Sequence, residues 1–163
     1  MFASIFGWLL TIGLAAGAAW WWLRRGAALR RRAAREAAQA AARFLADAAL
    51  LADRFLAVAS RGGKPRGLIW KACRFQAPRP LLARDTATGE LYALAAVDIT
   101  FDAIAGGDME EVAAVSDIRG ATAVFVWRAD RWDTDGRVVF NLEPEETLLR
   151  FGNALVRCET AHD

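Results

Sequence analysis

The sequence predicts an α+β protein with an N-terminal single transmembrane helix, an alanine-rich helix, an antiparallel meander sheet of about five to seven strands, and a C-terminal helix. Three observations predict it: residues 3–23 carry no charged side chain, residues 27–59 contain neither Gly nor Pro, and the sequence after Pro65 alternates with period two. We therefore expect four parts: a transmembrane anchor over 1–23, a basic juxtamembrane segment over 24–35, an amphipathic helix over 36–60, and an antiparallel α+β domain over 67–163.

The segment 3–23 has the length and composition of a membrane span. At a rise of about 1.5 Å per residue it is roughly 30 Å long, which matches the hydrocarbon core of a bilayer. It ends in Trp20, Trp21 and Trp22, whose indole rings favour the headgroup boundary. The first six residues lack the Lys or Arg of a cleaved signal peptide, so we expect an uncleaved signal anchor. A cleaved signal peptide and a buried core helix are the alternatives.

Positive charge lies entirely on one side of this segment. Residues 24–35 carry six arginines and no acid, whereas residues 36–163 carry 15 basic and 19 acidic side chains, a net of −4. The positive-inside rule predicts an outward N-terminus and a cytoplasmic domain in the cell membrane. A net-acidic domain predicts no nucleic-acid partner. We expect the arginines to meet anionic lipid headgroups at the membrane interface, namely Arg24, Arg25, Arg30, Arg31 and Arg32.

Two small residues within the segment have the spacing of a helix-packing motif. Gly13 and Gly17 are four residues apart, so they share a face on which a second helix could approach closely. This spacing predicts a weak homodimer through the span.

The alanine-rich helix carries an apolar stripe. We expect the stripe to pack on the sheet of the same chain, because its bulky members begin only at Phe44; a dimeric coiled coil is the alternative. Arg43 and Asp47 can pair across one turn. The stripe comprises Ala37, Ala41, Phe44, Ala48, Leu51, Phe55 and Val58.

Alternating apolar residues predict the strands of the sheet. In the first strand, Leu68 and Trp70 are expected on one face, and Ile69, Cys73 and Phe75 on the other. Glu143 and Pro144 are typical of a helix start, and this helix is expected to run to about residue 158. The predicted strands are Gly67–Phe75, Leu81–Arg84, Leu91–Phe101, Glu110–Ser116, Ala121–Arg128 and Arg137–Leu142.

Few residues have the pattern of a chemical site. The sequence predicts no catalytic, cofactor or metal-binding residue, because its one histidine is His162 and its two cysteines form no ligand cluster. The segment 133–136 is expected to be a β-turn rather than a calcium loop. Asp98 and Asp102 are interpreted as solvated edge charges, with an acid/base pair as the alternative.

Arg131 and Trp132 are the candidate residues for binding a partner. A two-residue turn at 129–130 would instead place Trp132 opposite Trp127 in a hairpin, where the two rings would pack together. An exposed Trp beside Arg has the composition of a binding hot spot.

The resulting hypothesis is a membrane-anchored binding or adaptor domain at the cytoplasmic face rather than an enzyme. Its expected partners are a bilayer with anionic headgroups and a protein. Two alternatives stay open: a hydrolase that uses carboxylates in a sheet cleft, and a cell-envelope protein whose domain faces outward.

Overall fold

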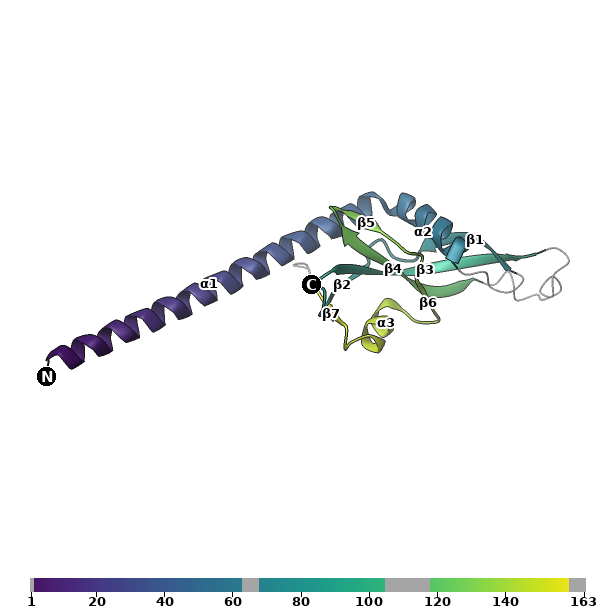
Figure 1. The fold of residues 1–163 in the computed structure, drawn as a ribbon. Helices are drawn as coiled ribbons and strands as arrows, with labels where there is room; N and C mark the ends of the chain where they lie inside the picture. The colour runs from purple at the N-terminus through teal and green to yellow at the C-terminus, as the bar shows by residue number, and fades with distance from the viewer. Residues whose placement is uncertain (1, 63–67, 105–117, 159–163) are drawn as a thin grey trace. The chain divides into compact units, whose positions relative to one another are not determined.

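The computed structural model describes residues 2–62, 68–104 and 118–158; before residue 20, the surroundings of a residue are described only at Gly17. These residues form an α+β protein with three helices and a seven-stranded antiparallel sheet (Figure 1). The predicted class of fold is therefore confirmed. The chain divides into two compact units, residues 1–36 and 37–163. The predicted strand at Glu110–Ser116 lies outside the described residues.

Two helices come first, followed by six strands, a short helix and a last strand. In chain order they are α1 (Phe2–Ala46), α2 (Ala48–Gly62), β1 (Leu68–Phe75), β2 (Leu81–Asp85), β3 (Leu91–Ala103), β4 (Arg119–Arg128), β5 (Arg131–Asp133), β6 (Val138–Phe140), α3 (Pro144–Arg150) and β7 (Leu155–Arg157).

The backbone of the first unit is helical throughout its described part. Within the part of the chain whose side chains are described, no helix is both long enough and apolar enough to cross a membrane. The side chains of most of the segment 3–23 are not described, and Gly13 belongs to that part.

β3 is the central strand of the sheet. One of its edges pairs with β4 along most of its length, and the other pairs first with β2 and then with β1. β4 is shared in the same way by β5 and β6, and β7 extends the sheet beyond β2. All pairs are antiparallel, as short connections between neighbouring strands require.

The main core lies between the sheet and residues 37–62. The helical stripe buries Phe44, Leu51 and Phe55, and the alternate residues of β3 from Leu91 to Phe101 face it. Packing within one chain, predicted for this stripe, is therefore observed. The helix is not continuous, because α1 ends at Ala46; Asp47 lies between the helices and its carboxylate binds Arg43 at 2.8 Å.

One extra residue in β1 reverses its alternation. The pairing with β3 shifts between Trp70 and Ala72, so Lys71 bulges out of the ladder. As a result Cys73 and Phe75 pack against the same core as Trp70, and the prediction that they occupy the opposite face was wrong.

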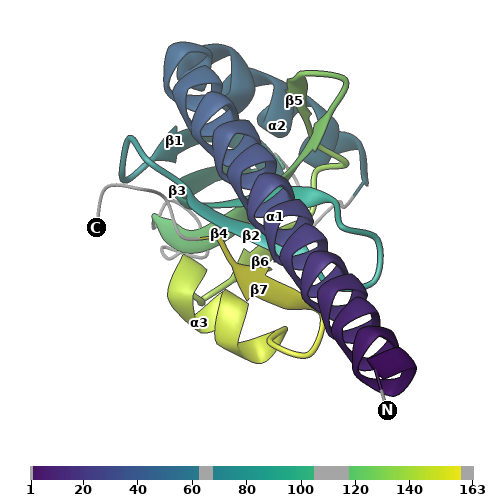
Figure 2. The ribbon, with the colours of Figure 1, turned by 90° about the vertical axis from the view of Figure 1, so that its left-hand side faces the viewer.

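The predicted C-terminal helix is much shorter than expected. α3 ends at Arg150, and a turn around Gly152 leads to β7, where Val156 lies opposite Arg84 of β2. The apolar residues at 155 and 156 therefore belong to a strand, because the edge of β2 offers them backbone hydrogen bonds. α3 covers the face of the sheet that is opposite to α2 (Figure 2), where Leu94, Thr122 and Thr147 are buried.

Candidate functional site

The tryptophans and arginines predicted at a membrane interface lie on α1. Trp20, Trp21 and Trp22 are exposed, and the arginines at 30, 31 and 32 are exposed as well. The guanidinium of Arg24 lies 4.1 Å from the centre of the Trp20 ring, and that of Arg25 lies 5.1 Å from the centre of the Trp21 ring. Each pair is four residues apart, the spacing that places helical side chains on one face.

Of the two glycines in the predicted helix-packing motif, the structure describes the surroundings of one. A Cβ built at Gly17 would meet nothing within 4 Å, so this position of the helix is open. Gly13 lies outside the described side chains. The homodimer through this motif stays a prediction.

Trp132 is buried in the core, so its side chain does not form the predicted binding surface. It is 3% exposed, and its Nε1 donates a hydrogen bond to the carbonyl of Ala40 at 2.8 Å. Its ring packs against Phe44 and Trp127, which lies directly opposite in the β4–β5 hairpin. Because Trp132 is buried, the prediction that its side chain binds a partner is corrected. Arg131, the residue before it, is exposed.

Asp98 and Asp102 bind separate partners on the outer face of β3. Asp98 accepts a hydrogen bond from Gln76 at 2.8 Å, and Asp102 forms an ion pair with Lys71 at 3.0 Å. Each carboxylate is occupied by its own neighbour rather than facing the other. Among the described residues, no group of His, Cys, Asp or Glu is arranged to hold a metal ion.

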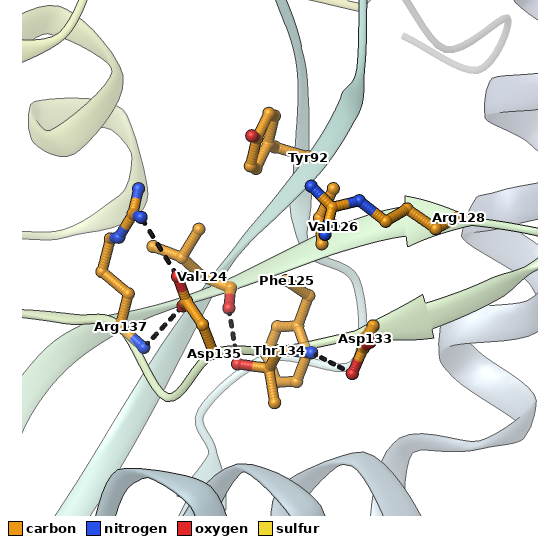
Figure 3. Close-up of a pocket in the computed structure, with 9 residues that line it drawn as sticks. All are labelled: Tyr92, Val124, Phe125, Val126, Arg128, Asp133, Thr134, Asp135 and Arg137. Carbon is orange, nitrogen blue, oxygen red and sulfur yellow. Dashed lines mark hydrogen bonds and ion pairs between the residues drawn. The ribbon is translucent and has the colours of Figure 1, made fainter. Parts of the chain in front are cut away.

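Two adjoining hollows lie on the side of the sheet that carries α3. They share three lining residues, Tyr92, Val124 and Arg137. We call the first the polar hollow: it has a volume of about 160 Å³, lies beside the edge of β4, and is also lined by Phe125, Val126, Arg128, Asp133, Thr134 and Asp135 (Figure 3).

The segment between β5 and β6 shapes the polar hollow. Thr134 donates its hydroxyl hydrogen to the carbonyl of Val124 at 2.9 Å, and the amide of Val124 donates to the carbonyl of Arg137 at 3.0 Å. Asp135 binds both the backbone amide and the guanidinium of Arg137 at 3.1 Å. These bonds fix the loop so that Arg137 flanks the hollow, opposite Arg128 in the view of Figure 3.

Glu90 connects the other charged groups at the polar hollow. Its carboxylate accepts two hydrogen bonds from Arg128 at 2.8 and 2.9 Å and one from the Tyr92 hydroxyl at 3.0 Å. Arg128 and then Tyr92 hold the pKa of Glu90 below its ordinary value. Partial burial, followed by the bond to Glu90, raises the pKa of Tyr92, so its phenol stays protonated near neutral pH.

We call the second the apolar hollow, and its volume is about 150 Å³. Leu94 and Thr147 at its wall are each 1% exposed. The Thr147 hydroxyl is buried, and it is the one such side-chain oxygen or nitrogen in the described chain without a hydrogen-bond partner. The hollow is lined by Asp85, Tyr92, Leu94, Val124, Arg137, Val139, Thr147, Phe151, Ala154 and Leu155.

Sequence reasoning missed both hollows because seven segments of the chain contribute to them. One available signal was the second set of apolar residues on the supposedly polar face, Leu94 on β3 and Val124 on β4. A strand with apolar residues on both faces is covered on both faces.

Comparison of the chain with protein-family models, curated proteins and solved structures gave no significant match.

Proposed function

We propose that this chain is a membrane-anchored binding protein, held at the cytoplasmic face of the cell membrane, and that its two hollows form the binding site. The observation that carries the anchor is the arrangement at the end of the charge-free segment 3–23. There Arg24 and Arg25 lie over the rings of Trp20 and Trp21. A guanidinium held on an exposed indole presents positive charge beside an apolar surface, which suits the boundary between lipid tails and phosphates.

Binding rather than catalysis is supported by the contacts at the hollows. The charged side chains there bind one another or a backbone turn: Glu90 binds Arg128, and Asp135 binds Arg137. Asp133 binds Arg54 at 2.8 Å. Such pairing shapes a surface and orients donors, whereas general acid/base chemistry needs a group with reach to a substrate proton.

The anchor is tested by membrane extraction. The full chain is expected to stay in the membrane pellet after washing with alkaline carbonate, and a variant lacking residues 2–23 is expected to leave it. The matched control replaces the six arginines of 24–35 by Gln and keeps the apolar segment. Full release of the complete chain by carbonate would overturn the proposal.

Orientation is tested by fusions at the C-terminus. A fluorescent protein is expected to be bright and a periplasm-active phosphatase inactive, because arginines are retained on the cytoplasmic side. In the Gln control this preference is expected to weaken. An active phosphatase with a dark fluorescent fusion would instead favour the outward-facing alternative.

A further inference from the structure

We propose that the polar hollow binds a small acidic α-amino acid, with Arg128 binding the α-carboxylate, Asp133 the α-ammonium group and Arg137 the side-chain carboxylate. This inference deepens the proposed binding function and rests on it. It fails separately, because a chain that binds no amino acid would still be retained by its membrane anchor.

Arg128, Asp133 and Arg137 follow one another along the polar hollow (Figure 3). Asp133 lies opposite Val126, so Arg128, two residues further along β4, is its diagonal neighbour on the same face of the sheet. Diagonal neighbours are about 7–8 Å apart, within reach of long side chains. Arg137 lies toward the other end, because its carbonyl accepts a hydrogen bond from the amide of Val124. Positive, negative and positive charge therefore alternate along the hollow.

Arg128 and Asp133 attract each other without a direct contact. Glu90 chiefly, and Asp133 more weakly, raises the pKa of Arg128. Among the described residues, however, Arg128 bonds Glu90, and Asp133 bonds Arg54 and the amide of Thr134. An α-amino acid carries its carboxylate and its ammonium group on one carbon. It can therefore lie between such a guanidinium and such a carboxylate with both of its charged groups paired.

Both arginines keep N–H donors that a ligand can reach. Arg128 uses Nε and Nη2 for Glu90, which leaves both hydrogens of Nη1 and one of Nη2. The guanidinium of Arg137 binds Asp135 through Nη2. The side chains of Arg128, Asp133 and Arg137 are 59%, 37% and 65% exposed, so none is hidden from a ligand. The carboxylates that hold the two guanidinium groups reduce the conformational freedom lost on binding.

The charge balance of the polar hollow favours a zwitterion over a simple dicarboxylate. Each arginine there already binds a carboxylate of its own, so two further negative charges alone would be poorly compensated. An ammonium group on Asp133 reduces this repulsion. Arg54 and the amide of Thr134 both bind Oδ1 of Asp133, which leaves Oδ2 to accept from the ammonium group. The hollow is open to solvent, so a charged ligand can stay partly hydrated there.

The experiment compares three ligands on the full chain in lipid nanodiscs by equilibrium dialysis, with empty nanodiscs as the blank. The ligands are glutamate, glutarate, which lacks the ammonium group, and glutamine, which lacks the side-chain charge. We expect glutamate to bind about fivefold more tightly than either of the others, as one partly exposed ion pair allows. Equal binding of the three ligands to the unchanged chain would overturn the proposal, whatever the stability of any variant.

Two variants assign the charged groups. Asp133→Asn is expected to abolish the preference for glutamate over glutarate and to keep that over glutamine. Its matched control is Arg54→Gln, which removes the same ion pair but leaves the Asp133 carboxylate, and it should keep both preferences. Arg137→Gln is expected to abolish the preference over glutamine alone. Its control, Arg74→Gln, lies on an exposed residue of β1 and should change neither preference.

Three further outcomes would overturn the proposal. The first is the absence of saturable glutamate binding. The second is a preference over glutarate that survives in Asp133→Asn or is lost in Arg54→Gln. The third is a preference over glutamine that survives in Arg137→Gln. Thermal unfolding of each variant, measured in the same nanodiscs, shows that the comparison is made on folded protein.

Discussion

At the scale of single residues, Trp132 shows how one side chain can connect separate layers. Its ring lies between Phe44 of α1 and Trp127 of β4, and its indole nitrogen bonds the backbone of Ala40. A tryptophan in this position supplies packing area and a directional bond at once. From the sequence, Trp132 was a candidate for an exposed contact because it follows a tight turn. The helix that buries it lies about ninety positions away, so the residues next to Trp132 do not indicate its burial.

Replacement of Trp132 should therefore destabilise the domain. Trp132→Ala is expected to lower the free energy of unfolding by about 3–5 kcal/mol, since it opens a cavity and removes the bond to Ala40. Urea unfolding followed by circular dichroism measures this loss. Arg131→Ala, at the exposed neighbour, is the control and should change stability by less than about 0.5 kcal/mol. A small effect of Trp132→Ala would contradict the packing role.

Gly136 offers a second test because two constraints meet there. Its φ of +77° is unfavourable for residues with a Cβ, and a Cβ would lie 2.7 Å from the amide nitrogen of Ala59 in α2. Gly89 has a similar φ of +74° but open space around it. We expect Gly89→Ala to cost about 1 kcal/mol, and Gly136→Ala to cost clearly more, because the backbone of α2 must move. Equal losses of unfolding free energy would disprove the close approach.

The burial of Cys73 determines the protonation state of its thiol. Burial in the core, with a smaller contribution from Asp98, raises the pKa of its thiol to about 12. The thiol is therefore neutral at physiological pH.

At the scale of elements, alternation in the sequence was a reliable guide to the strands and a poor guide to their faces. In the long run from Leu91 to Phe101 every second residue, beginning with Leu91, is apolar and buried, so the face that packs against the helices could be predicted; Leu94, on the other face, is buried as well. In β1 the single bulge at Lys71 exchanges the faces, and no residue type marks that position. The C-terminal helix was overestimated because Leu155 and Val156 suit a helix as well as a strand, and only the free edge of β2 decides between them.

The turn between β2 and β3 makes stability depend on acid. Hydrogen bonds from the amides of Thr88 and Ala87 hold the pKa of Asp85 below its ordinary value, and Arg128 does the same for Glu90. A depressed folded-state pKa contributes stability above the unfolded value and loses it as the pH falls through the folded value. We therefore expect the domain to lose stability as the pH drops below about 4.

Variants at these carboxylates check the assignment. Glu90→Gln and Asp85→Asn should each lower the melting temperature at neutral pH and flatten its decline in acid. Asp53→Asn, on the exposed side of α2, is the control and should keep the full decline. If the acid-dependent loss were unchanged in both variants, other carboxylates would have to account for it.

At the scale of the whole molecule, the core that stabilises the folded domain lies within residues 37–163. The buried core that the structure describes begins at Ala37 and includes Phe44, Leu51 and Phe55. Deletion of residues 2–23 is therefore expected to leave a domain that melts cooperatively. Deletion of residues 2–46 removes Phe44 and should abolish the cooperative transition. Calorimetry of the two truncated chains distinguishes them, and loss of cooperativity in the shorter deletion would show that the domain depends on its first residues.

The pairing of β7 with β2 has a consequence for how the chain is made. β2 is synthesised early, but the strand that covers its outer edge leaves the ribosome only after β3 to β6 and α3 have emerged. Until then the edge of β2 presents backbone groups to which any other extended chain could bind. Arg84 and Asp85 place charge along that edge, which discourages such pairing. The outer edge of β2 is thus covered only late in synthesis, by a strand of three residues.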